Sequence, residues 1–190
     1  MSLPDDYLAV LEHLGRACAA YKRATSIDPI LVGGAATALQ TSGAFMSADF
    51  DIVAAEDETF AESMTAAGFV AEGGVGHLAG GFYHPDHPHY TVEQVSGSLF
   101  DGLSDHTRLI RLVIEEGVEI VIPAVEDLIA DRLGQHAIAS RGDASRLLQA
   151  KALFIMGGDL DRRYLHRRII EEGGDPALID LSDDTCEPSR

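Results

Sequence analysis

The apolar residues near the start of the chain are spaced three and four positions apart. Over residues 5–24 they include Leu8, Leu11, Leu14 and Cys18, which fall on one side of a helix. Acidic residues begin this segment and basic residues end it, an order that the helix dipole favours. The pattern therefore predicts a first helix over residues 5–24.

The following segments are shorter and change between strand and helix character. Apolar runs bounded by Gly, Pro or Asp predict strands, and amphipathic runs that end at glycine predict helices. The predicted elements are a strand over 30–32, a helix over 35–43, a strand over 49–55, a helix over 56–69 closed by Gly68, a strand over 90–95 and a hairpin over 107–122. Residues 70–89 are rich in Gly, His and Pro, and we expect strands joined by loops there.

After Pro123 the pattern becomes purely helical. Apolar positions three and four apart predict helices over 124–139, 143–156 and 160–173. We therefore expect an α/β (α+β) fold, with a mixed β-sheet, flanking helices and a C-terminal helical bundle. The predicted organisation is a core over 1–122, a helical region packed on it over 123–175 and a tail over 176–190.

Length and composition limit the classes of protein to consider. A chain of 190 residues, 46% hydrophobic and 24% charged, suits one globular unit or a domain with a small appended bundle. It has no apolar stretch of membrane-spanning length and no export signal, so we expect a soluble cytoplasmic protein without a membrane partner. Cys18 and Cys186 are too few for a disulfide framework or a zinc finger.

Charge argues against one class of partner. The formal net charge of −17 would repel a nucleic-acid backbone, so a long duplex is not an expected partner. Eight of the fourteen Lys and Arg residues nevertheless lie between Arg132 and Arg168. This basic segment has two interpretations, a solvated helix surface that balances nearby carboxylates, or a face that meets a triphosphate or an acidic partner.

Two adjacent glycines and an Asp-x-Asp sequence carry the densest chemical signal. Gly33 and Gly34 lie between a predicted strand and a predicted helix, where backbone N–H groups can approach a phosphate because no Cβ intervenes. Asp49 and Asp51 are two residues apart on a strand, so their side chains share one face, roughly 7 Å apart at the backbone. Their mutual repulsion calls for a cation, and hard oxygen ligands suit magnesium together with phosphates. Alone, each pattern also fits a tight turn or exposed acids, but together they favour a site.

The segment 30–53, "ILVGGAATALQTSGAFMSADFDIV", resembles the signature of the polymerase-beta-type nucleotidyltransferase superfamily. That signature is an apolar strand, Gly-Gly or Gly-Ser, a short helix and Asp-x-Asp on the neighbouring strand. The small bacterial and archaeal members, several of them toxins or antitoxins, are the most similar, and weaker similarity continues through 90–102 and 123–153. The resemblance implies metal-dependent transfer of a nucleoside monophosphate from a nucleoside triphosphate to a hydroxyl of a protein, an RNA or a small molecule.

The resemblance also implies roles for individual residues. Gly33 and Gly34 would hold the β and γ phosphates, while Asp49 and Asp51 would bind Mg²⁺ or Mn²⁺ ions that bridge those phosphates. The serine that often follows the glycines is replaced by Ala35, which removes one hydrogen bond to phosphate. A site that binds nucleotide without turning it over is therefore also compatible with the sequence.

A third carboxylate would bind the second metal ion and help to activate the acceptor hydroxyl. We select Glu93, because it lies in the middle of a predicted strand, where a buried carboxylate would be costly without a metal or a donor. Glu119 and Asp101 are the other candidates. Glu93 also fits the solvent face of an edge strand.

Basic residues of the predicted helices offer a further contact. Arg132 or Arg141 could steady the triphosphate, because a guanidinium matches phosphate oxygens in pairs. The alternative is that they form ion pairs with Asp127, Asp131 or Asp143 that hold the helices together.

Two other functions stay open. The first is a non-catalytic, antitoxin-like or regulatory module that keeps the fold and binds a partner through its helices. The second is a metal hydrolase built on a histidine loop, since four histidines lie within one Gly- and Pro-rich stretch: His77, His84, His87 and His89. Their spacing matches no established zinc pattern, so surface histidines are the simpler interpretation.

Overall fold

The computed structural model describes residues 3–72, 81–95, 98–140 and 142–181. The chain divides into two compact units, Met1–Pro123 and Ala124–Arg190. Among the described helices, none combines the length and the apolar character that crossing a bilayer requires.

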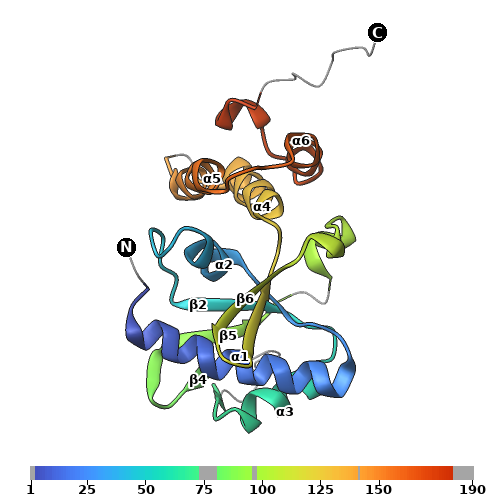
Figure 1. The fold of residues 1–190 in the computed structure, drawn as a ribbon. Helices are drawn as coiled ribbons and strands as arrows, with labels where there is room; N and C mark the ends of the chain where they lie inside the picture. Colours follow the sequence, from blue (N-terminus) through green and yellow to red (C-terminus); the bar gives the residue numbers. More distant parts are fainter. Residues whose placement is uncertain (1–2, 73–80, 96–97, 141, 182–190) are drawn as a thin grey trace. The chain divides into compact units, whose positions relative to one another are not determined.

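The first unit contains the sheet and three α-helices (Figure 1). Its helices are α1 (Asp5–Thr25), α2 (Gly33–Gln40) and α3 (Asp57–Ala66), with short 3₁₀ turns η1 (Leu99–Gly102) and η2 (His106–Arg108). Its strands are β1 (Ile30–Val32), β2 (Asp49–Val53), β3 (Val70–Ala71), β4 (Phe82–His84), β5 (His87–Gln94), β6 (Ile110–Glu115) and β7 (Val118–Ile122). The described strands form one sheet in the order β3-β4-β5-β2-β1-β7-β6.

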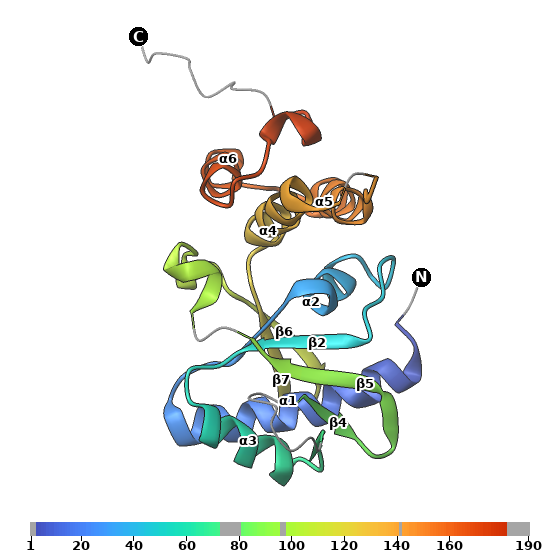
Figure 2. The ribbon, with the colours of Figure 1, turned by 180° about the vertical axis from the view of Figure 1, so that it is seen from behind.

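The sheet is mixed, as the sequence predicts. Strand β1 is antiparallel to β2 and parallel to β7, while β2 is parallel to β5. Helices α1 and α3 lie on one side of this sheet and α2 lies on the other (Figures 1 and 2). The mixed α/β class expected from the hydrophobic pattern is therefore confirmed.

The sheet face that carries α1 and α3 holds most of the core. Phe50 and Ile52 of β2 are fully buried, and the ring of Phe50 lies 5.0 Å from that of Tyr7 on α1. Because side chains alternate along a strand, burying these two residues turns Asp49 and Asp51 to the opposite face. Packing of the core thus decides where the two carboxylates point.

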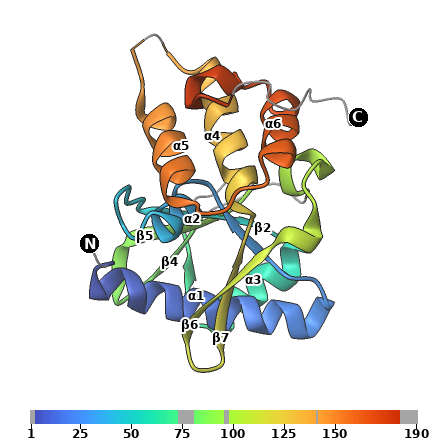
Figure 3. The same ribbon diagram turned by 45° about the horizontal axis from the view of Figure 1, so that its top comes forward.

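The second unit is helical. It consists of α4 (Val125–Ile138), α5 (Ser145–Met156), α6 (Arg162–Glu171) and the 3₁₀ turn η3 (Pro176–Ile179). Helix α4 lies between α5 and α6 (Figure 3). At its centre, the fully buried carboxylate of Asp127 accepts hydrogen bonds from Arg168 Nε at 2.6 Å and from the Tyr164 hydroxyl.

Two element boundaries differ from the prediction. Helix α2 begins at Gly33, two residues earlier than the apolar pattern predicts. The segment expected to hold strands joined by loops does contain strands, but β5 begins at His87, three residues before the predicted strand, and includes Pro88. This proline is tolerated because β5 pairs with β2 only from Thr91 onward, so at Pro88 no N–H is needed on that side of the strand.

Candidate functional site

Three acidic side chains lie on the α2 face of the sheet, on adjacent strands. Asp49 and Asp51 are on β2, and the parallel register places Asp51 directly beside Glu93 of β5. Paired residues of neighbouring strands point to the same face, so Glu93 joins the two aspartates there. The structure therefore brings together the three carboxylates that the sequence selects.

The glycine turn lies against the same carboxylates. Strand β1 pairs Val32 with Asp51, so the chain turns into α2 at Gly33, one residue beyond that pair. Gly33 has φ +68°, and a Cβ added to it would collide with the Asp51 carboxylate oxygen. Only glycine satisfies both the backbone angle and the close approach at this position.

Gly34 lies against a serine that the sequence analysis did not select. A Cβ added to Gly34 would lie 2.7 Å from Ser47 Oγ, in the loop that precedes β2. The Ser47 hydroxyl in turn donates to the backbone carbonyl oxygen of Asp49, at 3.1 Å. A hydroxyl therefore stands at the glycine turn even though Ala35 follows the glycines. No local pattern predicts it, because Ser47 and Gly34 are thirteen residues apart.

A second hydroxyl orients Asp49. Strand pairing sets Thr91 of β5 opposite Asp49, and the Thr91 hydroxyl donates to Asp49 Oδ1 at 2.7 Å. This bond fixes one carboxylate oxygen and leaves the other Asp49 oxygen available for a cation. The spacing of Thr91 and Glu93, two residues apart on one strand, is the signal that could have identified Thr91.

The donor set suits a hard divalent cation. Carboxylate oxygens on a rigid strand are the ligands that magnesium prefers, and the ion usually keeps several waters and shares its shell with substrate phosphates. Within the described ranges, however, no three His, Cys, Asp or Glu side chains are close enough together to form a ready-made metal centre. The three acids therefore match the donor chemistry of such an ion without assembling a three-ligand centre by themselves.

The surroundings of Glu93 add negative charge to this face. A Cβ added to Gly81 would lie 3.5 Å from Glu93 Cγ and 3.7 Å from Glu72 Oε2. Gly81 thus separates two acidic side chains, while Asp51 lies on the other side of Glu93. Glu93 itself is exposed.

The two alternative third carboxylates lie elsewhere. Glu119 is on β7, two strands away from β2, and its Oε2 lies 3.8 Å from Arg111 Nη1. Asp101 lies in η1 with φ +53°, in a left-handed turn that also includes Phe100. Of the three candidates, Glu93 is the one that strand pairing sets beside Asp51.

A hollow of about 390 Å³ occupies the other end of β1 and β2. Ile30 and Val53, which pair with each other, line it together with Leu99 and Arg111. Ile30, Val53 and Leu99 also belong to the apolar cluster that contains Val32. The carboxylates are therefore at one end of these strands and this hollow is at the other.

Arg132 belongs to the helical unit and is almost completely buried. Its guanidinium pairs with Asp131 and lies 3.4 Å from Gln149 Oε1 on α5. These contacts match the ion-pair role that the sequence left open for Arg132, and its phosphate-binding role stays a prediction. Arg141 lies outside the described residues.

The described histidines of this stretch form no metal-binding group of three. His84 and His87 lie together, whereas His89 is exposed on β5, and His77 lies outside the described residues. The described part of the chain offers no metal-binding group of three to a histidine-loop hydrolase.

Comparison with known proteins identifies structures that have a similar fold. No protein-family model matches the chain, and no curated protein sequence matches it significantly. A structure with a similar fold is that of an antigenic nucleotidyltransferase-like protein from Paracoccidioides brasiliensis. It has a TM-score of 0.59 and 15% sequence identity, over 89% of this chain and 88% of that chain. JHP933 from Helicobacter pylori gives a TM-score of 0.53 and 17% identity, over 94% of this chain and 78% of that chain.

The chain therefore has a nucleotidyltransferase-like fold, which the resemblance of residues 30–53 predicts. At these identities the likeness concerns the fold, and a site has to be argued from its own residues.

Proposed function

We propose that this protein is a metal-dependent nucleotidyltransferase, which moves a nucleoside monophosphate from a nucleoside triphosphate to a hydroxyl acceptor. The observation that carries the proposal is the position of Asp51, between the Gly33 turn and Glu93 on one face of the sheet. A glycine turn binds phosphate through its backbone N–H groups, which no side chain covers. Carboxylates beside such a turn bind the cation that accompanies a polyphosphate.

Each residue has a defined task in this reaction. Gly33 and Gly34 bind the β and γ phosphates through backbone N–H groups, and Asp49, Asp51 and Glu93 hold Mg²⁺ or Mn²⁺. The bound ions supply charge neutralisation for the triphosphate and for the leaving pyrophosphate. Glu93 accepts the proton of the acceptor hydroxyl, whose oxygen forms a bond to the α phosphorus as the bond to the β-phosphate oxygen breaks.

The two hydroxyl residues complete the site. Ser47 stands beside Gly34, where its hydroxyl can donate to a phosphate oxygen by giving up its present bond to the Asp49 carbonyl oxygen. Thr91 keeps Asp49 in one orientation through its 2.7 Å hydrogen bond, which lowers the cost of ordering that carboxylate when an ion binds. These contacts compensate for the absence of a serine directly after the glycines.

The acceptor is a protein, a small RNA or a small molecule in the cytoplasm, and a long nucleic-acid duplex is disfavoured by the net charge of −17. A second candidate function is a non-catalytic, antitoxin-like or regulatory module. The observation that favours it is that Ala35 stands where a serine often follows the glycines, so one hydrogen bond to phosphate is missing there.

Two measurements on purified protein test the proposal. The first is the shift in unfolding temperature caused by each nucleoside triphosphate, with and without Mg²⁺ or Mn²⁺. The second is transfer of label from an α-labelled triphosphate to a host lysate. We expect both signals in the wild type and neither in Asp49→Asn or Asp51→Asn. The matched control is Glu58→Gln, which changes an exposed acid on α3 and should leave both signals intact.

The two candidates give different outcomes. Metal-dependent stabilisation without label transfer would favour the non-catalytic module. Transfer that survives both aspartate substitutions would disprove the site.

A further inference from the structure

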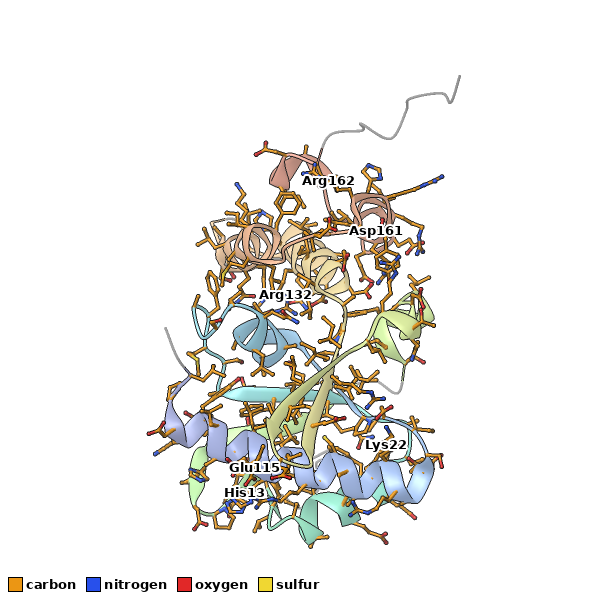
Figure 4. The ribbon with its side chains drawn as sticks, viewed as in Figure 1. His13, Lys22, Glu115, Arg132, Asp161 and Arg162 are labelled. Carbon is orange, nitrogen blue, oxygen red and sulfur yellow. The ribbon has the colours of Figure 1, made fainter. Side chains whose placement is uncertain are left out.

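Three histidines from three elements meet on the α1 side of the sheet. His13 of α1 stacks on His84 of β4, with ring centres 3.8 Å apart and planes 22° apart. The ring of His87, on β5, lies 5.9 Å from that of His84 and 6.3 Å from that of His13. Figure 4 marks His13 on α1. The stacked rings have nearly parallel planes, so their in-plane lone pairs cannot converge on one metal ion.

His84 is the central member of this cluster. It is 6% exposed, and the ring of Phe69 approaches it edge-on at 5.4 Å. A Cβ added to Gly68 would lie 2.9 Å from His84 Nε2, so the segment after α3 also packs against this ring. The imidazole is therefore enclosed by α1 on one side and by the segment after α3 on another.

The hydrogen bonding of His84 requires the neutral ring. The backbone N–H of Asp86 donates to His84 Nδ1 at 3.3 Å, so this nitrogen acts as an acceptor. A protonated imidazole carries hydrogen on both nitrogens and can accept no such bond. Adding a proton to Nδ1 would therefore remove the bond that the turn between β4 and β5 makes to the ring.

Protonation would also place like charges against one another. The charged or titratable groups that face His13 are Arg16 on the same helix, His84, His87 and Asp86. Burial lowers the pKa of His13 below its ordinary value of 6.5, and His84, Arg16 and His87 lower it further, whereas Asp86 raises it. The Asp86 side chain is 80% exposed and lies 3.9 Å from His84 Nδ1, so solvent weakens its attraction.

We propose that His13, His84 and His87 form a proton-sensitive clasp, which holds the β4–β5 hairpin against α1 while His13 is neutral. Protonation of His13 places positive charge against the stacked His84 ring and beside Arg16, and loosens the hairpin. A second contact between α1 and β5 persists on acidification, because it consists of the aromatic rings of Tyr7 and Tyr90, whose centres lie 5.5 Å apart.

The sign of the pH dependence follows from the lowered pKa. The unfolded chain binds protons at His13 more readily than the folded protein does, so the clasp contributes its full stability above pH 6.5. That contribution is lost as the pH falls below 6.5. The unfolding temperature of the wild type should therefore fall between about pH 7.5 and about pH 5.

His13→Phe provides the test, because it keeps a flat ring for stacking and removes the titrating nitrogen. Over this pH interval, we expect the unfolding temperature of the variant to fall by roughly 2–4 °C less than that of the wild type. Hydrogen exchange should show the excess acid loosening in the β4–β5 hairpin of the wild type. His89→Phe is the matched control, since His89 is an exposed histidine on β5, the strand that also carries His87, and it should behave as the wild type.

An NMR titration of the wild-type histidines tests the clasp without any substitution. The proposal requires His13 to titrate below 6.5, with shift changes at His84 in the same interval. It is overturned if His13 titrates at or above 6.5, or if folded His13→Phe has the pH dependence of the wild type.

Discussion

Asp127 in the helical unit is fully buried beside an arginine, whereas Asp49 in the sheet unit is exposed and accepts a hydrogen bond from a threonine. Arg168 donates to Asp127, and also to Glu171 at 2.8 Å and Glu172 at 2.5 Å. The helical unit therefore compensates its buried charge internally, while the sheet unit presents acidic side chains to solvent on one face.

This difference separates a structural role from the binding role that we propose for the sheet face. Burial lowers the pKa of Arg168, but hydrogen bonds to Asp127, Glu171 and Glu172 outweigh it and raise the pKa above its usual value. The guanidinium thus stays charged, and its partners need no external ion. On the sheet face, Glu93 makes no ion pair with a described residue, and Asp49 is bonded to a neutral hydroxyl. A bound cation can supply the missing positive charge there.

The largest effect is expected in the helical unit. Arg168→Met leaves Asp127 buried without its cation, and we expect a loss of about 3–5 kcal/mol in the free energy of unfolding. Urea denaturation followed by circular dichroism measures this loss. The control is Arg163→Met, an exposed arginine on the same helix, which should change the free energy by less than about 0.5 kcal/mol. Equal losses in both variants would remove the distinction between the two units.

The glycine turn gives the next largest effect. Gly33→Ala places a Cβ against the Asp51 carboxylate and strains a backbone with φ +68°. Gly117→Ala is the control, because Gly117 has φ +79° with open space around it, so that variant reports the backbone strain alone. We expect about 1 kcal/mol of destabilisation for Gly117→Ala and a larger loss for Gly33→Ala, measured by thermal unfolding. Similar losses would show that Asp51 is not held against the turn.

The Thr91 hydroxyl should affect binding more than stability. Thr91→Val keeps the shape of the side chain and removes its hydrogen bond to Asp49, so we expect magnesium-dependent nucleotide affinity to fall about threefold to tenfold. Thr91→Ser restores the hydroxyl and should restore most of the affinity, as measured by isothermal titration calorimetry. If the serine variant binds as weakly as the valine variant, Thr91 acts through packing and does not orient Asp49.

The smallest effect is expected at a surface ion pair of the sheet unit. Figure 4 marks Lys22 near the end of α1. Asp28 lies 2.8 Å from Lys22 Nζ and accepts two hydrogen bonds from Arg111. The hydrogen bonds from Arg111, and then those from Lys22, hold the pKa of Asp28 below its ordinary value of 3.8. A carboxyl whose pKa is lowered on folding stabilises the protein above pH 3.8, and this contribution is lost as the pH falls below that value.

Asp28→Asn should therefore lower the free energy of unfolding at pH 7 by less than about 1 kcal/mol. The difference from the wild type should shrink as the pH falls below 3.8, when chemical denaturation is repeated in acid. A difference that is constant with pH would assign the effect to packing instead of charge.

Local patterns were sufficient where a single element decides the outcome. The first helix was predicted over 5–24 and spans Asp5–Thr25, because its apolar spacing persists over several turns. The shared face of Asp49 and Asp51 follows from the period of a strand. The start of β5 at His87 is less predictable, because a proline such as Pro88 is compatible with a strand only where one side of the ladder is unpaired.

Those local patterns do not predict contacts between residues that are far apart in the sequence. Thr91 meets Asp49 because β5 pairs with β2 in one register, and shifting that register by one residue would turn Thr91 and Glu93 to the other face. Ser47 meets Gly34 because of a loop path, and His13 meets His84 because α1 packs across β4.

By itself, the sequence determined the type of most elements and the pairing of a glycine turn with two acids, because these depend on spacing along the chain. The tertiary structure alone decided which side chains join them. That choice depends on strand register and helix packing, which are set by burial of the whole core and not by any one segment.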